Sequence, residues 1–443
     1  MQLKPERVEL RTETLAHLLG LSGDQSEQKN GNVTVSYKLA IPDYQRIYCW
    51  EEKQVIQLLE DIKGLSNRMY HLGSIILHKN EKEISHFIVD GQQRLVTLVL
   101  LLLELNKELY TPLLDEHFES SEAQSYLAYN KWLINNYVEK NSLKCYSQIL
   151  ENLQFSVLII NEDNLDLAYT FFSNQNSRGK ALSDYDLLKA HHLRYVLVQE
   201  QAMHLAGRWD AIVTMSDKMY GSRSDNREKI RSQAFEVCLF RLRKWMRKKD
   251  WSNDEKFKVK TEFESAPIIS EIPPFGEKFH FYESIQGGSH FFGYADYFIH
   301  LYQQFSTTIE FKALRKHLSS ERHWWYRDVI VALLFAYYMK FGTIYLAEAM
   351  DLIIKRISEH RYHSARAYFQ SVLSYANNSE IVMMIDQATS PTFFLAEINN
   401  VLKRLPRTPV LTGTRERYAM SVKRIHNETV AKSNELLTFI NEN

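Results

Sequence analysis

The stretch Asp90–Arg94 combines, within five residues, groups that bind anions. It reads Asp-Gly-Gln-Gln-Arg, follows the apolar run Phe87–Val89 and leads into a leucine-rich helix. The start of a helix has unpaired N–H groups and a partial positive charge, a glycine lets a ligand approach the backbone, and an arginine offers a fork of donors that suits phosphate. Asp90 could hold a hydroxyl or the Mg²⁺ of a nucleotide. An ordinary strand-to-helix turn with a surface arginine is the alternative, because the spacing matches neither a Walker loop nor a dinucleotide fingerprint.

An aromatic segment with one arginine lies upstream of this turn. It contains Tyr44, Arg46, Tyr48 and Trp50. The rings either form a hydrophobic plug beneath the next helix, or stack on a base or brace the loop while Arg46 faces an anion. The pattern alone favours neither interpretation.

A polar loop, Ser173–Lys180, is a third candidate. It contains Asn176, Arg178 and Gly179, and asparagine and glycine are typical of loops with left-handed backbone. The loop is either a plain connection between helices or a segment that offers amides and Arg178 to a ligand.

Two basic runs are candidates for contact with nucleic acid. The first surrounds Trp245, and the second, Lys403–Arg424, contains seven basic residues and one acid, Glu416. A basic helix face with an aromatic residue suits a phosphate backbone, although such a run is more often a solvated face. The candidate DNA-contacting residues of the first run are Arg241, Lys244, Arg247 and Lys248.

Composition limits the classes of protein that fit. Lys+Arg and Asp+Glu both number 54 among 443 residues, so net charge does not indicate nucleic acid and only local patches could. The cysteines, Cys49, Cys145 and Cys238, form no CxxC pair, which signals neither a zinc ribbon nor a disulfide framework. The N-terminus lacks the apolar core of a signal peptide, and the longest apolar runs are too short or too polar to span a bilayer. We expect a soluble, cytoplasmic protein with no membrane partner.

The elements that must position these residues follow from periodicity. Alternation of apolar and polar residues predicts a strand over 33–41, and a hairpin is predicted from Tyr70–His78 and His86–Asp90. From about residue 205 the chain is predicted to be almost wholly helical. The other expected elements are a strand over Phe155–Ile160, helices over Thr12–Leu19, Leu95–Tyr110 and Asp184–Gln201, and an irregular connector over 252–293.

Three motifs, taken in order, resemble the N-terminal domain of GmrSD-type, modification-dependent restriction systems. The resemblance covers about residues 10–200, and a further block at Phe171–Lys189 fits the same family. The three motifs are Ile41-Pro42-x-x-Gln45-Arg46-x-Tyr48-x-Trp50, Leu72-Gly73-Ser74-Ile75-Ile76 and Ile88-Val89-Asp90-Gly91-Gln92-Gln93-Arg94.

The resemblance implies a fold and a ligand. The expected fold is α+β, with a small mixed-sheet, ParB/sulfiredoxin-like domain over 1–203, a helical insertion at about 111–150, and a mainly α-helical domain over 204–443. Family members are implicated in bacterial defence against phage DNA that carries modifications, and several bind and hydrolyse a nucleoside triphosphate. Carried over by position, the nucleotide site would comprise Asp90, Gly91, Gln92, Gln93 and Arg94, completed by Arg46 and Tyr48 and closed on one side by Asn176, Arg178 and Gly179.

The leading hypothesis is therefore a nucleotide-binding, NTP-hydrolysing component of a restriction system. Arg94 and the amides after Gly91 would hold the phosphates of GTP or ATP, Asp90 would orient Mg²⁺ or a ribose hydroxyl, and Gln93 would position water, since phosphoryl transfer depends mainly on electrostatic positioning. Two rivals remain. One is a DNA-binding sensor without catalysis that uses the basic runs, and the other is a nuclease that uses acidic groups such as Asp90.

One departure from the family concerns DNA cleavage. Many members carry a C-terminal HNH-type nuclease domain, which needs a general-base histidine and a metal-binding His/Asn set. His426-Asn427 has no second histidine downstream, so the sequence does not predict this domain. A partner nuclease subunit would then supply cleavage, and self-association of the chain is left open.

Overall fold

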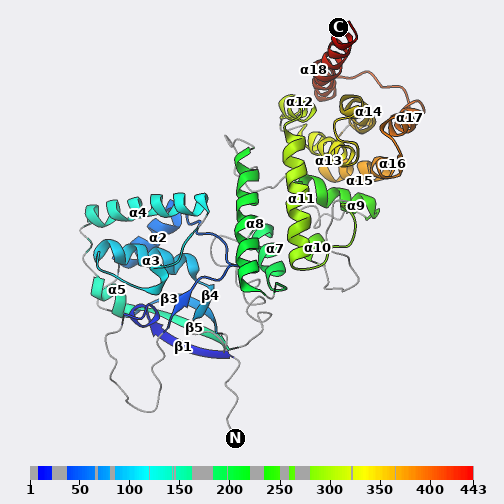
Figure 1. Ribbon diagram of the computed structural model, residues 1–443. Coiled ribbons are helices and arrows are strands. Elements are labelled where there is room, and N and C mark those ends of the chain that lie inside the picture. Colours follow the sequence, from blue (N-terminus) through cyan, green and yellow to red (C-terminus); the bar gives the residue numbers. More distant parts are fainter. Residues whose placement is uncertain are drawn as a thin grey trace. The chain divides into compact units, whose positions relative to one another are not determined.

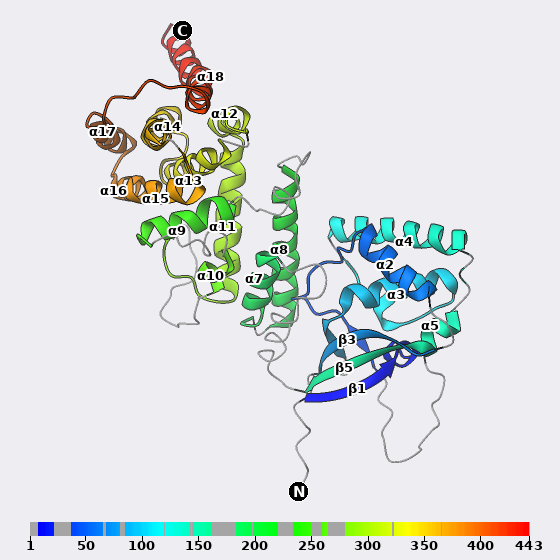
Figure 2. The same ribbon diagram turned by 180° about the vertical axis from the view of Figure 1, so that it is seen from behind.

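The computed structural model divides the chain into two units, Met1–Thr214 and Met215–Asn443 (Figures 1 and 2). Each unit is described by itself. The structure describes residues 8–21, 37–64, 68–79, 85–118, 120–141, 143, 146–161, 183–196, 198–219, 234–249, 259–264, 280–320, 323–364 and 366–442.

A five-stranded mixed sheet organises the N-terminal unit. Its strand order is β1-β5-β3-β4-β2, with antiparallel β1/β5 and β3/β4 pairs and parallel β5/β3 and β4/β2 pairs. Side chains alternate along β5 between buried and half-buried, as a strand with two unequal faces requires. The strands are β1 (Val8–Thr14), β2 (Leu39–Ala40), β3 (Tyr70–Lys79), β4 (His86–Asp90) and β5 (Leu153–Asn161).

Helices cover both faces of this sheet. Helices α2, α3 and α4 lie over one face (Figure 1), and their apolar side chains share a core with Ile75, Leu77 and Ile88. Ala190 and Leu187 of α7 pack on the other face. The helices are α1 (Leu15–Leu18), α2 (Glu52–Lys63), α3 (Gln92–Leu105), a 3₁₀ turn (Pro112–Leu114), α4 (Ser121–Asn141), α5 (Tyr146–Asn152), α7 (Asp184–Leu193) and α8 (Gln199–Met219).

The C-terminal unit is helical in its described residues. Its central helix, α13 (Trp324–Phe341), is buried continuously from Tyr326 to Tyr337 because other helices surround it. The others are a π-helical segment (Ala234–Leu239), α9 (Phe240–Met246), α10 (Val259–Glu264), α11 (Ser289–Ser306), α12 (Ile309–His317), α14 (Leu346–His363), α15 (Phe369–Asn378), α16 (Ile381–Gln387), α17 (Pro391–Leu402) and α18 (Thr414–Glu442).

These observations confirm the α+β fold, with a mixed sheet first and a helical region after it. The hairpin and the strand around Phe155–Ile160 are confirmed with small changes of bounds. Of the strand predicted over 33–41, the described residues contain only Leu39–Ala40, and 33–36 lie outside the described residues. No helix among the described residues is both long and apolar enough to cross a bilayer.

Three predictions about local structure were wrong in part. The helix predicted over Thr12–Leu19 is a strand as far as Thr14, because β1 pairs with β5, whose sequence is far away. The helix predicted over Asp184–Gln201 is interrupted between α7 and α8. The connector predicted over 252–293 contains α10, which buries Val259 and Phe263 one turn apart.

His86, at the start of β4, is expected to make the N-terminal unit sensitive to acid. Its side chain is buried edge-on against the Tyr37 ring, 5.1 Å between centroids, and neither ring nitrogen has a hydrogen-bond partner among the described residues. Burial, with smaller contributions from Lys79 and Arg11 and against an opposing one from Glu9, lowers the pKa of His86 to about 4. The unfolded chain, with a His pKa near 6.5, binds the proton more readily.

Stability from neutral His86 is therefore complete above about pH 6.5 and is lost as the pH falls towards 4. We expect His86→Phe, which keeps a ring against Tyr37, to reduce the fall in melting temperature between pH 7 and pH 5. An unchanged fall in the variant would show that other groups cause the acid sensitivity.

Candidate functional site

Gly91 forms the turn between β4 and α3 and cannot be replaced by another residue without strain. Its φ is +101°, in the region that favours glycine. A Cβ atom placed on Gly91 would lie 2.2 Å from Cδ1 of Ile75, a fully buried residue of β3. The glycine therefore allows β3 to pack directly against the turn, which brings the start of α3 to the end of β4.

The two glutamines after Gly91 hold the segment around Arg46 in place. Gln92 donates from Nε2 to the Arg46 carbonyl at 3.1 Å, and Gln93 donates from Nε2 to the Ile47 carbonyl at 3.1 Å. The Cys49 N–H donates to Gln93 Oε1 at 2.9 Å. Both side-chain amides are buried, and the Gln93 amide has a hydrogen-bond partner at its oxygen and at its nitrogen. The structure gives Gln93 a positioning role, and the water-positioning role expected from the sequence stays a prediction.

Arg94 reaches back to the irregular first half of β3. It donates from Nη1 to the Leu72 carbonyl at 3.0 Å and from Nη2 to the Ser74 carbonyl at 2.6 Å. Gly73 lies between these carbonyls with φ +107°, and a Cβ there would lie 2.7 Å from Arg94 Nη1. Nη2 also meets Asp90 Oδ2 at 3.4 Å. The Arg94 guanidinium therefore stabilises the part of β3 where its register with β5 shifts, between His71 and Ser74.

Asp90, Arg94 and Arg46 form a charged corner at the end of β4. The side chains of Asp90 and Arg94 are 31% and 23% exposed. Burial raises the pKa of Asp90, while Arg94, the Gly91 N–H and Arg46 act in the opposite direction. Burial likewise lowers the pKa of Arg94, opposed by Asp90. Both guanidiniums thus act on one partly buried carboxylate, which brings together three of the residues predicted from sequence.

Two residues that the predicted site did not include support the corner from behind. Gln45 donates from Nε2 to the carbonyls of Ile88 at 2.8 Å and Val89 at 2.6 Å, on the strand that ends at the corner. The buried Lys189 of α7 donates to the Gln45 carbonyl at 3.0 Å and pairs with Asp210 of α8 at 2.8 Å. Gln45 and Lys189 each belong to one of the family motifs, so the sequence marked both residues. It did not show the hydrogen bond between them.

Tyr48 is not a ligand-contacting residue in this structure. Its side chain is fully buried, its hydroxyl lies 2.8 Å from Thr97 Oγ1, and Asn130 donates to it at 3.1 Å. The expectation that Tyr48 completes a nucleotide site was wrong, because α3 and α4 enclose the ring. The candidate residues Asn176, Arg178 and Gly179 lie outside the described residues.

The donors at the corner fit a metal ion only when a nucleotide accompanies it. Among the described residues, no group of three His, Cys, Asp or Glu side chains could hold a metal. Mg²⁺ is usually bound by one or two carboxylates together with substrate phosphates. Asp90 supplies one such carboxylate, so the corner is not a metal site built from protein ligands alone.

The basic run around Trp245 is not the surface expected from the sequence. Arg241, Lys244 and Trp245 are at most 4% exposed, so these cations cannot reach a DNA backbone. Lys248 pairs with Glu380 at 2.8 Å, and Arg247 with Glu262 at 2.6 Å. The prediction of DNA contact was wrong for Arg241 and Lys244, which are buried. It loses its basis for Arg247 and Lys248, because carboxylates neutralise both side chains.

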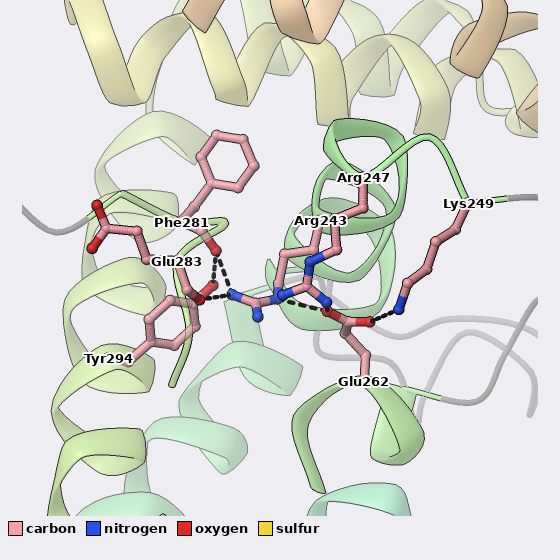
Figure 3. Close-up of polar contacts among 7 residues, drawn as sticks. All are labelled: Arg243, Arg247, Lys249, Glu262, Phe281, Glu283 and Tyr294. Atoms are coloured by element: carbon pink, nitrogen blue, oxygen red, sulfur yellow. Dashed lines mark hydrogen bonds and ion pairs between the residues drawn. The ribbon is translucent and has the colours of Figure 1, made fainter. Parts of the chain in front are cut away.

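Arg243 is the centre of this network (Figure 3). It donates from Nε to Glu262 at 2.9 Å and from Nη1 to the carbonyls of Phe281 at 2.7 Å and Glu283 at 2.9 Å. Lys249 approaches the other oxygen of Glu262 at 3.8 Å. The run therefore joins α9 to α10 and to the segment before α11.

These features define an α+β domain with a glycine turn, a charged corner and a supporting motif from the helix behind it. Residues 25–193 match the family model described as the GmrSD restriction endonuclease, N-terminal domain, so this part of the chain is similar to that family. Residues 264–409 match a family of unknown function, DUF7834. A search of curated proteins found no match.

Proposed function

We propose that this protein is a nucleotide-binding, NTP-hydrolysing component of a bacterial restriction system that acts against phage DNA. The match of residues 25–193 to the GmrSD restriction family model supports the place in defence. The charged corner at the start of α3 supports the nucleotide, and it is the single observation that carries this part of the proposal.

The corner combines positive charge with unused donors. A guanidinium has five N–H groups, and the described contacts of Arg94 use three of them, which leaves Nε and one Nη1 hydrogen for a phosphate. The first amides of α3 add partial positive charge at the same place. Gln92 Oε1 is buried without a partner among the described residues, and a donor on a bound ligand or water would satisfy it.

The roles of the residues follow from these positions. Arg46 and Arg94 would hold phosphate oxygens, and the Asp90 carboxylate would hold the Mg²⁺ that accompanies the nucleotide. Gln92 and Gln93 keep Arg46 beside Asp90 through the carbonyls of the segment that carries Arg46. When bound, Mg²⁺ would neutralise charge on the phosphates.

Arg46→Gln and Asp90→Asn test the proposal in the full chain, because both leave in place the hydrogen bonds from Arg94 to the Leu72 and Ser74 carbonyls. We expect Arg46→Gln to weaken binding of fluorescent ATP or GTP by about 10-fold to 100-fold, the value of one or more charge-assisted hydrogen bonds. Asp90→Asn should abolish Mg²⁺-dependent phosphate release. Arg68→Gln and Glu108→Gln change the same charges at exposed positions and should bind as the wild type.

Wild-type affinity in both corner variants would contradict the assignment. Arg94→Ala is less informative, since it also removes the hydrogen bonds to Leu72 and Ser74 and is expected to lower stability. The melting temperature of each variant therefore accompanies its binding curve.

A further inference from the structure

The segment between α17 and the first turns of α18 carries cations that the fold does not neutralise. Residues 403–424 contain seven Lys and Arg against one Glu, in a chain with no net charge. Arg415 is partly buried and donates to the Tyr362 carbonyl at 3.2 Å. The other six are exposed and have no ion pair in the part of the chain that the structure describes: Lys403, Arg404, Arg407, Arg417, Lys423 and Arg424.

The geometry of the segment spreads these charges over two structural elements. Figure 1 shows an open connection that leaves α17 and runs to α18, and it contains Pro406 and Pro409, which restrict its backbone. In α18, Tyr418 and Ile425 are buried, while Arg417 and Arg424 are exposed. These two arginines are two turns apart, about 10.5 Å along the helix axis. That separation spans about three nucleotides of one DNA strand, at about 3.4 Å each.

The contrast with the first basic run identifies which charges are available. Around Trp245, Glu262 and Glu380 satisfy the exposed cations, and Arg241 and Lys244 are buried. In residues 403–424 the only acid, Glu416, is exposed and makes no ion pair among the described residues. An unpaired cluster of cations attracts an anionic partner, whereas a neutralised cluster does not.

We propose that residues 403–424 form the surface through which this protein binds the phosphate backbone of DNA. Five of the seven cations are arginines, whose planar fork matches phosphate oxygens. Thr408, Thr412 and Asn427 are exposed beside them and supply the short donors that often contact phosphates. The inference rests on the proposed place in a restriction system, and it names the partner surface of that function. Contacts of this kind position the protein on DNA without reading sequence.

The test is binding of a 30-base-pair duplex to the full chain as a function of salt. In the double variant Arg417→Gln/Arg424→Gln we expect affinity to fall on the order of tenfold at low salt. The slope of log K against log salt should fall by about 1.8, because each lost phosphate contact removes about 0.9. The control Arg247→Gln/Lys248→Gln removes the same charge from the paired run and should bind DNA as the wild type does.

An equal loss in both variants, or a loss in the control alone, would overturn the proposal. So would a wild-type protein that ignores duplex DNA but binds vesicles containing phosphatidylserine, since the cations would then serve a membrane surface. Nucleotide binding by the same variants separates the two proposals. The tail variant should bind ATP or GTP normally, and Arg46→Gln should bind DNA normally.

Discussion

Gly91→Ala is expected to destabilise the N-terminal unit by about 2 to 6 kcal/mol. An alanine at φ +101° carries about 1 to 3 kcal/mol of backbone strain, and overpacking of a buried side chain adds about 1 to 3 kcal/mol. The overpacking arises because the new Cβ would lie 2.2 Å from Ile75 Cδ1. Urea unfolding, with amide exchange of peptides from α3, measures the loss.

Gly342 provides the matched control for this substitution. It also has a positive φ, +63°, but a Cβ there would meet nothing within 4 Å. Gly342→Ala should therefore cost only the backbone strain of a positive φ, about 1 to 3 kcal/mol. Gly91→Ala should cost less stability when it is made in an Ile75→Ala background than in the wild type, because the smaller side chain leaves room for the new Cβ. Equal losses at the two glycines would show that Ile75 does not press on the turn.

Glu262→Gln is expected to destabilise the C-terminal unit by about 3 kcal/mol or more. The change leaves Arg243, whose side chain is 3% exposed, without its carboxylate partner. An uncompensated buried charge typically costs about 3 to 5 kcal/mol. The same change also removes the partner of Arg247 and Lys249. Amide exchange of peptides from α9 and α10 should accelerate, and the urea midpoint of this unit should fall.

Glu380→Gln is the control for the buried pair. Glu380 pairs with Lys248 at 2.8 Å, but both side chains are more than half exposed. Exposed pairs contribute at most about 1 kcal/mol. If the two variants lost the same stability, the buried position of Arg243 would not be the source of its dependence on Glu262.

Local pattern predicted the hairpin and the turn at Gly91 because these depend on neighbouring residues. The structure explains why β3 has a glycine at position 73. The register of β3 shifts between His71 and Ser74, and Arg94 occupies the space that a side chain on Gly73 would need. The sequence showed both residues in their motifs without showing that one makes space for the other.

Contacts between distant segments could not be predicted in this way. Thr12–Thr14 were predicted as helix, and their pairing with β5 depends on residues about 140 positions away. The basic residues around Trp245 were misinterpreted for the same reason. Glu262 neutralises Arg243 and Arg247, but it lies too far along the chain for the local pattern to show these pairs. Lys189 and Gln45 belong to separate motifs, and only the fold shows the hydrogen bond that joins them.

The proposed nucleotide site depends most on the corner formed by Asp90, Arg46 and Arg94. Hydrogen exchange of the full chain, with and without saturating ATP or GTP and Mg²⁺, tests it most directly, because it locates the ligand as well as detecting it. We predict slower exchange in peptides that cover residues 42–50 and 88–96, and no such change in Arg46→Gln. Unchanged exchange in both peptides at millimolar nucleotide, or protection confined to other segments, would contradict the account.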